Sequence, residues 1–309
     1  MAKSVLSAKH FQDEDAAFAY VEAALWPNGP VCSFCGSGDR VGRMNGKTTR
    51  PGLCKCYACK KPFTVRMGTI FESSHLPLRY WLQVIHLMSA SKKGVSTRQI
   101  QRMLNCSMKT AWHLTHRIRE IMLPDASPIG GAGKIVEADE TFITNSKRTK
   151  KRPGYQHKVA VLSFAERDGA IRSMALPANP DRPMIVKALV QHVHPESVLH
   201  TDGAQYYKGL WAVAGHESVN HSAGEYARKT DKGSVHVNTL EGFFSVFKRG
   251  MIGTYQRVSE THMPRYLAEF DFRQNTREKL GINDTMRAEI ALKGAVGKRL
   301  TYRTTSGQA

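Results

Sequence analysis

Three acidic residues in the second half of the chain have the types and spacing of a site for hard cations. Asp139 lies near the end of the apolar stretch KIVEADETFI, and Asp202 ends a second apolar stretch, SVLHTD. Glu241 lies in HVNTLEGFFSVFKRG. Carboxylates that converge without basic partners repel one another, and Mg²⁺ or Mn²⁺ relieves that repulsion. Two such ions can activate a water or hydroxyl and stabilise the leaving oxygen of a phosphodiester.

Each acidic residue also has a simpler interpretation. Asp139 could be an exposed residue at a strand end, Asp202 before a glycine could start a turn, and Glu241 could be a surface residue of its helix. Glu137 and Glu140 are alternatives to Asp139 as the ligand. On a strand, Glu137 shares a face with Asp139, whereas Glu140 points to the other face.

The segment around Glu241 has the pattern of an amphipathic helix. Asn238, Glu241 and Lys248 fall near one another on one side of such a helix. His236 precedes them, and we expect it to cap the helix or to pack. A second stripe recurs at intervals of three and four and predicts a buried face: Leu240, Phe243, Phe244 and Phe247.

Five of the six cysteines lie between residues 32 and 59, in two Cys-x-x-Cys pairs and one additional position. Two such pairs can supply the four thiolates of a tetrahedral structural zinc site. The expected ligands are Cys32, Cys35, Cys56 and Cys59. Cys54 could replace Cys56, although Cys56 has the two-residue gap to Cys59. Because protein ligands fill all four positions, we expect no chemistry at this zinc.

Apolar stretches separated by turn residues predict the elements that hold the three acids. From residue 134 on, the order is three strands, a helix over 181–193, the strand that ends at Asp202, and then further helices. This order predicts an α/β fold with a mixed central sheet. If the strands of Asp139 and Asp202 are neighbours, their carboxylates lie side by side.

Residues 76–123 read as three consecutive helices. Pro77 begins the first, and Ser96 and Ser107 are expected to cap the second and third. The short connection NCS between the last two helices is typical of a helix-turn-helix. The exposed face of the third helix is expected to contact DNA, through Lys109, Thr110, His113, His116 and Arg117. The alternative is a plain helical bundle with a solvated face. The Pro- and Gly-rich segment 124–133 predicts a linker.

The chain is strongly basic, with 45 Lys and Arg against 26 Asp and Glu and a formal net charge of +19 over 309 residues. Such an excess favours a polyanionic partner, above all double-stranded DNA. A basic loop directly after the first acidic strand is expected to hold DNA backbone, although it could be only a solvated loop: Lys147, Arg148, Lys150, Lys151 and Arg152.

Neither end of the chain predicts a membrane or export segment. The N-terminus becomes acidic where a signal peptide would be apolar, and no stretch of 18 or more apolar residues occurs. We therefore expect a cytoplasmic protein without a membrane span. Residues 281–309 carry few apolar residues near the end, and we expect this tail to fray.

Three motifs together, VEADETF, LHTDGAQYY and HVNTLEGFFSVFKRG, resemble those of the DDE-type transposases of bacterial insertion sequences. The branch that this chain resembles has an N-terminal zinc ribbon ahead of an RNase H-like catalytic domain. The resemblance covers roughly residues 15–280. It implies that Asp139, Asp202 and Glu241 form the catalytic triad and that Lys248 is the accompanying basic residue. Some relatives use asparagine in the third position, so Asn238 could share the role of Glu241.

The sequence thus predicts a zinc ribbon over 15–68, a helix-turn-helix region over 76–123, an RNase H-like catalytic domain over 130–280 and a tail over 281–309. The implied function is binding of terminal inverted repeats and metal-dependent DNA cleavage and strand transfer. Joining two DNA ends implies a homodimer or a higher assembly. The alternatives are a DNA-binding regulator without catalysis and a nuclease that does not join strands.

Overall fold

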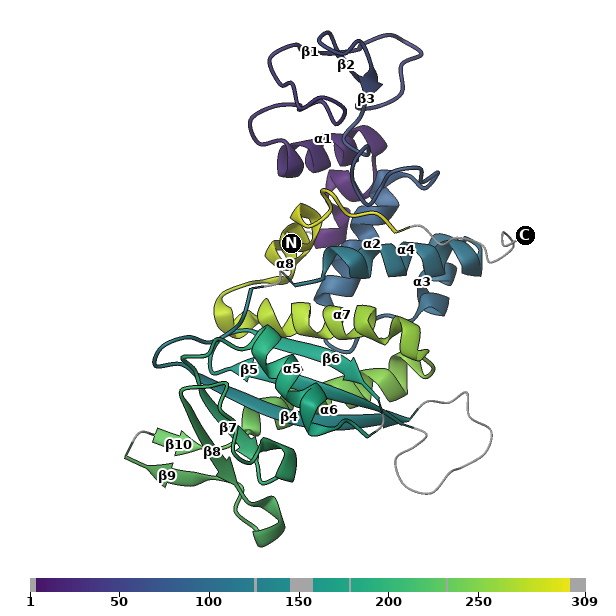
Figure 1. Ribbon diagram of the computed structural model, residues 1–309. Helices are drawn as coiled ribbons and strands as arrows, with labels where there is room; N and C mark the ends of the chain where they lie inside the picture. Colours follow the sequence, from purple (N-terminus) through teal and green to yellow (C-terminus); the bar gives the residue numbers. More distant parts are fainter. Residues whose placement is uncertain (1–3, 125–126, 145–157, 178, 232, 301–309) are drawn as a thin grey trace, which may run out of the picture. The chain divides into compact units, whose positions relative to one another are not determined.

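A computed structural model describes residues 4–124, 127–144, 158–177, 179–231 and 233–300 of the chain. The chain divides into two compact units. Unit 1 consists of Met1–Ser91, Val95–Met122 and Glu278–Ala309, and unit 2 consists of Lys92–Gly94 and Leu123–Arg277. Each unit therefore has its own core, and unit 1 is built from both ends of the sequence (Figure 1).

The first part of unit 1 is a small three-stranded antiparallel sheet that follows helix α1 (Glu14–Leu25). Its strands are β1 (Val41–Arg43), β2 (Cys54–Cys56) and β3 (Pro62–Phe63), in the order β1-β2-β3. These strands are too short to bury a core of their own. Phe63 and three cysteines form the small cluster that replaces such a core.

The rest of unit 1 is helical: α2 (Leu78–Ala90), α3 (Thr97–Leu104), α4 (Met108–Ile121) and α8 (Asp284–Lys293). Two short 3₁₀ turns, Val5–Ser7 and Lys9–Phe11, precede α1 near the N-terminus. The predicted caps are confirmed, because the hydroxyls of Ser96 and Ser107 accept hydrogen bonds from the amides of Gln99 and Thr110. Asn105 ends α3 in the left-handed conformation and allows the sharp turn into α4.

Two expectations about the helices of unit 1 are wrong. Residues 284–293 form helix α8 instead of fraying, because Ala291 and Leu292 are buried and Arg287 donates to the carbonyl of Ser89 on α2 (3.1 Å). His116 is fully buried rather than exposed on α4, and its ring packs on Trp112 with a centroid distance of 4.1 Å. Helical periodicity predicted that His116 is exposed, because it did not account for packing on both sides of α4.

Unit 2 is a mixed α/β unit built on a five-stranded sheet with the order β6-β5-β4-β7-β8. The strands are β4 (Ile135–Thr144), β5 (Lys158–Glu166), β6 (Ile171–Leu176), β7 (Val198–Asp202) and β8 (Gly215–Val219). The pairs β4–β5 and β5–β6 are antiparallel, whereas β4–β7 and β7–β8 are parallel. The predicted mixed central sheet is confirmed, and the strands of Asp139 and Asp202 are neighbours.

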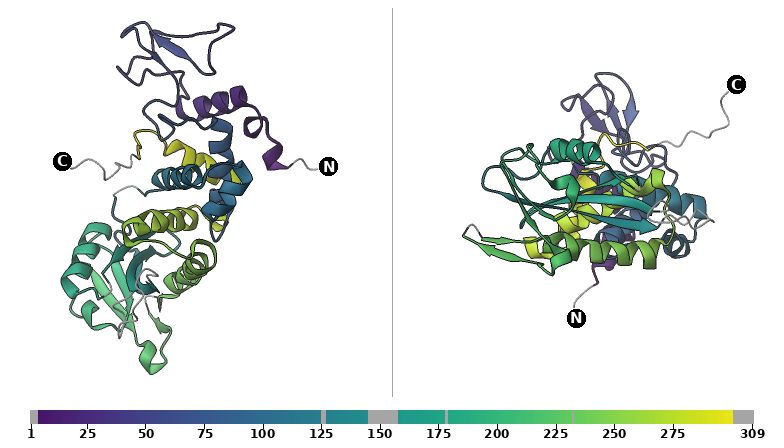
Figure 2. Two further views of the ribbon diagram at one scale, coloured as in Figure 1. Left: turned by 90° about the vertical axis from the view of Figure 1, so that its right-hand side faces the viewer. Right: turned by 60° about the horizontal axis from the view of Figure 1, so that its bottom comes forward.

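Helices cover both faces of this sheet (Figures 1 and 2). Helix α5 (Arg182–His192) packs on one face through Ile185, Ala188 and Leu189. Helices α6 (Asn238–Gly250) and α7 (Met263–Asn275) pack on the other face. The predicted apolar stripe of α6 is confirmed, and it contributes four buried side chains to this core: Leu240, Phe243, Phe244 and Phe247.

Smaller elements connect the sheet to these helices. They are the 3₁₀ turns Gln205–Tyr207, His221–Ala223 and Glu260–His262, the hairpin β9 (Arg228–Thr230) and β10 (Gly233–Val235), and the π-helical turn Met251–Tyr255. The 3₁₀ turn Glu278–Leu280 belongs to unit 1. Sequence analysis did not predict β8 or the hairpin. Within the described parts of the chain, no helix is long and apolar enough to cross a bilayer.

Candidate metal centres and acidic site

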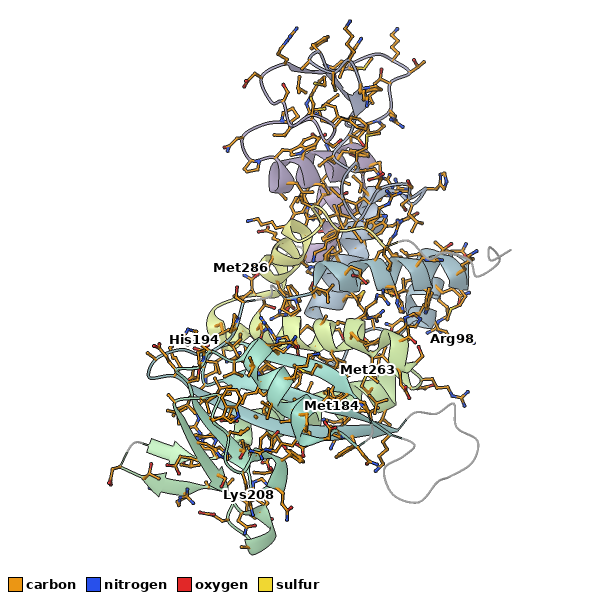
Figure 3. The ribbon with its side chains drawn as sticks, viewed as in Figure 1. Arg98, Met184, His194, Lys208, Met263 and Met286 are labelled. Atoms are coloured by element: carbon orange, nitrogen blue, oxygen red, sulfur yellow. The ribbon has the colours of Figure 1, made fainter. Side chains whose placement is uncertain are left out.

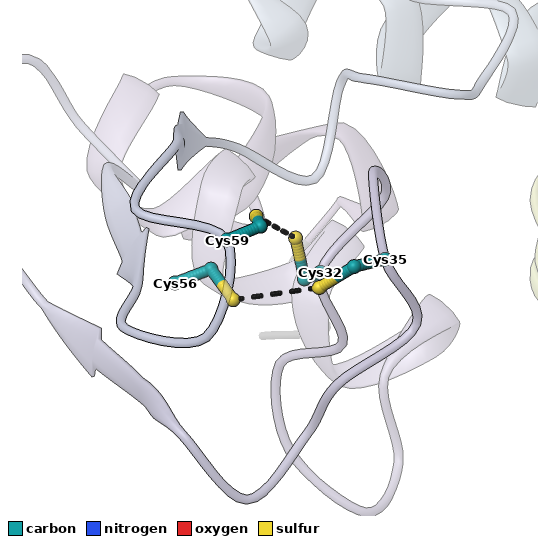
Figure 4. A group of neighbouring side chains, drawn as sticks. All are labelled: Cys32, Cys35, Cys56 and Cys59. Atoms are coloured by element: carbon teal, nitrogen blue, oxygen red, sulfur yellow. Dashed lines mark hydrogen bonds between the residues drawn. The ribbon is translucent and has the colours of Figure 1, made fainter.

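The four predicted cysteine ligands converge in unit 1. The sulfur atoms of Cys32, Cys35, Cys56 and Cys59 all lie within 4.8 Å of one another. Figure 4 shows the two closest pairs, Cys32–Cys59 at 3.7 Å and Cys35–Cys56 at 3.6 Å. Zinc–sulfur bonds of about 2.3 Å in a tetrahedron place the sulfurs about 3.8 Å apart. The cluster therefore fits a structural zinc ion held by four thiolates.

The backbone of the two knuckles is shaped for this arrangement. Gly36 and Lys60, which follow the second cysteine of each pair, both have positive φ angles, 74° and 61°. The amide of Gly36 donates to the carbonyl of Cys32 (2.9 Å). At the other knuckle, hydrogen bonds from the amides of Cys59 and Ala58 lower the pKa of the Cys56 thiol to about 7. The backbone thus favours the thiolate of Cys56. At Cys35, an amide hydrogen bond from Ser37 also favours the thiolate, but the sulfur of Cys56, burial and the sulfurs of Cys32 and Cys59 outweigh it and raise the pKa of Cys35 to about 11.

Cys54, the alternative ligand, does not belong to this cluster. Cys54 and Cys56 lie on the same short strand, and both are fully buried. Cys56 has its sulfur among the other three, whereas burial raises the pKa of the Cys54 thiol. The clustering of the sulfurs thus agrees with the choice of Cys56 from the two-residue gap to Cys59.

Asp139 and Asp202 lie at adjacent positions of two parallel strands in unit 2. The register pairs Glu137 with His200 and Ala138 with Thr201, so Asp139 and Asp202 are the next position on each strand. Side chains at matched positions of neighbouring parallel strands point to the same face. Asp139 also pairs with Ser163 of β5, on the sheet face that α6 and α7 cover. The two aspartates therefore lie side by side on that face.

The charges around Asp139 show that the acids influence one another. Burial and the charge of Asp202 raise the pKa of Asp139 to about 7, and Glu241 adds to the rise. A hydrogen bond from the amide of Glu140 and the charge of Lys248 act in the opposite direction. Glu241 and Lys248, both exposed on α6, thus act on the same carboxylate.

The three acids are spaced more widely than the cysteines. Among the described residues, the cysteine cluster is the one group of three or more potential ligands whose donor atoms all lie within 4.8 Å of one another. Within the same residues, Asp139 and Asp202 have no Lys or Arg ion-pair partner, and their side chains accept backbone amides of Glu140 (2.8 Å) and Ala204 (3.1 Å). Uncompensated carboxylates on one sheet face are the donors that hard divalent cations prefer.

The two alternatives to Asp139 have different surroundings. Glu137 is fully buried and forms an ion pair with Arg167, so its carboxylate already has a partner inside the protein. Glu140 accepts a hydrogen bond from the hydroxyl of Tyr207 (3.1 Å). Burial and the charges of Asp202 and Asp139 raise the pKa of Glu140 to about 8. Glu140 is therefore a fourth carboxyl group near Asp139 and Asp202. Because side chains alternate along a strand, it points to the opposite face of the sheet from Asp139.

His221 is a neighbour of the acidic site that sequence analysis missed. It follows β8, and its Nδ1 lies 3.8 Å from Oε1 of Glu241. Its ring packs on Tyr226 at a centroid distance of 5.2 Å. Strand β8 is parallel to β7, so residues that follow it lie at the same sheet edge as Asp202. The sheet topology, rather than any local motif, therefore indicates that His221 lies near the acidic site.

The predicted DNA-contact residues of α4 differ in exposure. Lys109 is exposed near the start of α4, whereas His113 and Arg117 are half-buried, and Arg117 lies over the ring of Trp81 at 6.0 Å. Sequence analysis did not single out Arg98 and Arg102, which are exposed on the preceding helix α3 (Figure 3 labels Arg98). The predicted basic-loop residues, Lys147, Arg148, Lys150, Lys151 and Arg152, lie outside the described residues.

Two segments of the chain match known protein families. Residues 131–275 match the ISXO2-like transposase domain, and residues 12–62 match a transposase zinc-ribbon domain. A relative from Halobacterium salinarum, described as an uncharacterized protein in transposable element ISH50, is 26% identical over 288 residues. That alignment covers 88% of this chain and 95% of the relative.

These matches agree with the structure. The zinc-ribbon match contains the four clustered cysteines, and the transposase match contains all three acidic residues and the sheet. The chain thus carries a transposase zinc-ribbon domain followed by an ISXO2-like transposase domain.

Proposed function

We propose that the chain is a DDE-type transposase that binds the terminal inverted repeats of its element and cuts and joins DNA strands at the acidic site of unit 2. One observation carries the proposal. Asp139 and Asp202 occupy matched positions on adjacent parallel strands, and Glu241 and Lys248 of α6 act on the same carboxylate. In this proposal, unit 2 has an RNase H-like fold.

Each residue of the site has a role in the proposal. Asp139, Asp202 and Glu241 hold the divalent cations, and Asn238, at the exposed first position of α6, assists Glu241. Lys248 contacts a phosphate near the scissile bond. Mg²⁺ or Mn²⁺ supplies the activation of the attacking oxygen and the charge stabilisation at the leaving oxygen.

DNA recognition falls to unit 1 in the same proposal. Helices α3 and α4 act as a helix-turn-helix, with α4 as the recognition helix and Lys109, His113 and Arg117 as its contacts. The zinc ribbon of unit 1 and the loop residues 147–152 of unit 2 add contacts to the DNA backbone. Joining two element ends requires two copies of the site, so the active form is a homodimer or larger assembly. In this proposal the protein acts in the cytoplasm.

The test is a cleavage and joining assay with the full chain. Labelled duplexes are made from the DNA that flanks the reading frame, and they are incubated with Mg²⁺ or with EDTA. We expect Mg²⁺-dependent nicking at the element end and joining of the released 3′ end to a second duplex. Glu241→Gln should lower the cleavage rate by more than about 100-fold, because direct ligands matter more than outer-shell partners.

The control is Glu196→Gln, an exposed acid outside the proposed site, which should cleave like the wild type. Cleavage without joining would indicate a nuclease, and binding without cleavage would indicate a DNA-binding regulator. Full activity of Glu241→Gln in Mg²⁺ would refute the proposed site.

A further inference from the structure

The carboxylate of Glu137 caps helix α6 from strand β4. It accepts hydrogen bonds from the amides of Thr239 (2.9 Å) and Leu240 (3.3 Å) and from the hydroxyl of Thr239 (2.9 Å). Helix α6 has no side-chain cap of its own, because its cap position is Val237. The first amides of a helix need acceptors and favour a negative charge. Glu137 supplies both the acceptor oxygens and the negative charge, although it lies more than 100 residues earlier in the chain.

A basic partner compensates the buried charge of Glu137. Arg167, in the turn between β5 and β6, donates from Nε to Glu137 Oε1 (3.2 Å). The same guanidinium donates to the carbonyls of Ser234 (2.6 Å) and His236 (3.2 Å), in the segment that leads into α6. The Nδ1 atom of His236 also lies 3.2 Å from Glu137 Oε1. The start of α6 is thus tied to β4 by several polar contacts around one carboxylate.

This cap lies directly beside the proposed ligands. Glu137 is two residues before Asp139 and on the same face of β4. Leu240, whose amide it accepts, is the residue before Glu241. The carboxylate therefore joins the strand that carries one proposed ligand to the helix turn that carries another.

We propose that Glu137 is a positioning residue of the metal site: by capping α6 from β4, it fixes the position of Glu241 relative to Asp139 and Asp202. The inference rests on the proposed function for what the site does, but the cap itself is a contact of unit 2. Glutamine at position 137 has one acceptor oxygen and one donor NH₂ group. The guanidinium of Arg167, at one oxygen, and the amides of Thr239 and Leu240, at the other, can only donate, so the NH₂ group would meet a donor in either orientation.

Unit 1 offers a matched control. Glu14 of α1 caps helix α2 in the same way, accepting the amides of Leu78 (2.7 Å) and Arg79 (3.2 Å). The cap position of α2 is Pro77, which provides no side-chain cap. Glu14→Gln therefore makes the same chemical change at a helix start in the other unit.

The experiment compares the full-length wild type with Glu137→Gln, Glu14→Gln and Glu241→Gln. Mn²⁺ binding is titrated by electron paramagnetic resonance, amide hydrogen exchange is followed over residues 237–244, and cleavage is measured against Mg²⁺ concentration. We expect Glu137→Gln to speed exchange at Thr239 and Leu240. It should also weaken Mn²⁺ binding by about 10- to 100-fold and raise the half-saturating Mg²⁺ concentration similarly. Its affinity for DNA should be unchanged, and Glu14→Gln should bind Mn²⁺ like the wild type.

Two outcomes would overturn the inference. Unchanged exchange in Glu137→Gln would show that the cap is not needed to order the start of α6. Faster exchange with wild-type Mn²⁺ binding would show that the cap does not position Glu241. If Glu137→Gln fails to fold, Thr239→Val replaces it, because it removes only the hydroxyl donor to Glu137. It should weaken Mn²⁺ binding by a smaller factor, and wild-type Mn²⁺ binding in this variant would equally overturn the inference.

The proposed function fails in a different way. If the wild type binds Mn²⁺ but cleaves no DNA, or if Glu241→Gln cleaves normally, the transposase site is wrong, whatever Glu137 does. If Glu241→Gln loses both Mn²⁺ binding and cleavage while Glu137→Gln keeps both, the transposase site is supported and the positioning role is refuted.

Discussion

At the scale of single residues, unit 2 holds a buried carboxyl group on α7 that takes no part in the proposed chemistry. Asp271 accepts hydrogen bonds from the amide and the hydroxyl of Ser173, both at 2.7 Å, and it is 1% exposed. Burial raises its pKa to about 7, although the bonds from Ser173 and the charge of Arg172 oppose the rise. An acid whose pKa is higher in the folded protein loses stabilising free energy as pH rises from about 4 to about 7.

Asp271→Asn should therefore flatten the dependence of stability on pH. The asparagine oxygen can accept the Ser173 amide, and its NH₂ group can donate to the Ser173 hydroxyl, so the neutral side chain fits. Urea unfolding of metal-free protein at pH 5 and pH 8 measures the effect. The wild type should lose more unfolding free energy between these values than the variant, by on the order of a few kcal/mol.

Asp139 and Glu140, whose pKa values are also raised, remain in both proteins, so some pH dependence should persist. Asp181→Asn, at the exposed cap of α5, serves as the control substitution. An equal or steeper loss in Asp271→Asn would mean that Asp271 does not hold its proton in the folded protein.

At the scale of elements, the zinc ribbon depends on its two knuckles more than on its strands. The three strands have two or three residues each, and a four-residue cluster of cysteines and Phe63 forms their core. Zinc binding in such a domain contributes folding free energy directly. Loss of one ligand should therefore unfold the ribbon without affecting the sheet of unit 2.

Cys56→Ala and Cys54→Ala make a matched pair for this prediction. Both cysteines are fully buried on β2, and one methyl-sized side chain replaces either thiol. Zinc stoichiometry by atomic absorption should stay at about one per chain for Cys54→Ala and fall well below one for Cys56→Ala. Limited proteolysis should then cut Cys56→Ala within residues 30–65 first. Equal zinc content in the two variants would contradict the assignment of the ligands.

Local patterns predicted the elements of this protein better than they predicted its long-range contacts. The caps at Ser96 and Ser107 and the apolar stripe of α6 depend on residues within one helix, so the sequence shows them. The role of Glu137 depends on Thr239 and Arg167, which only the folded sheet brings near. His221 likewise reaches Glu241 through the parallel pairing of β7 and β8, a topology that no local motif shows.

At the scale of the whole molecule, unit 1 combines segments from both ends of the sequence. Helix α8 contributes Leu292, 1% exposed, to its interior, and Arg287 ties α8 to α2. The C-terminal segment is thus part of the unit that carries the zinc ribbon, although the transposase domain separates the two in sequence. The net charge of +19 belongs to the same scale, because it favours DNA binding in low salt regardless of sequence.

Leu292→Ala should destabilise unit 1 by about 2–5 kcal/mol, because it leaves a cavity in a packed interior. Ile290→Ala, on the same helix but 41% exposed, should cost much less. Hydrogen exchange resolved by peptide measures both: the amides of α2 and α4 should exchange faster in Leu292→Ala, and those of β4 and β5 should not. Faster exchange confined to unit 2 would show that α8 supports the other core.

The position of α8 in the sequence also determines the order in which the two units can fold during synthesis. Synthesis proceeds from the N-terminus, so every residue of unit 2 leaves the exit tunnel before α8 leaves it and can dock against α2. The unit with the zinc ribbon therefore completes its core only after the transposase domain exists. A nascent or prematurely terminated polypeptide would lack α8 and therefore a complete unit 1. Few truncated chains could then bind an element end without also carrying the sheet that holds the acids.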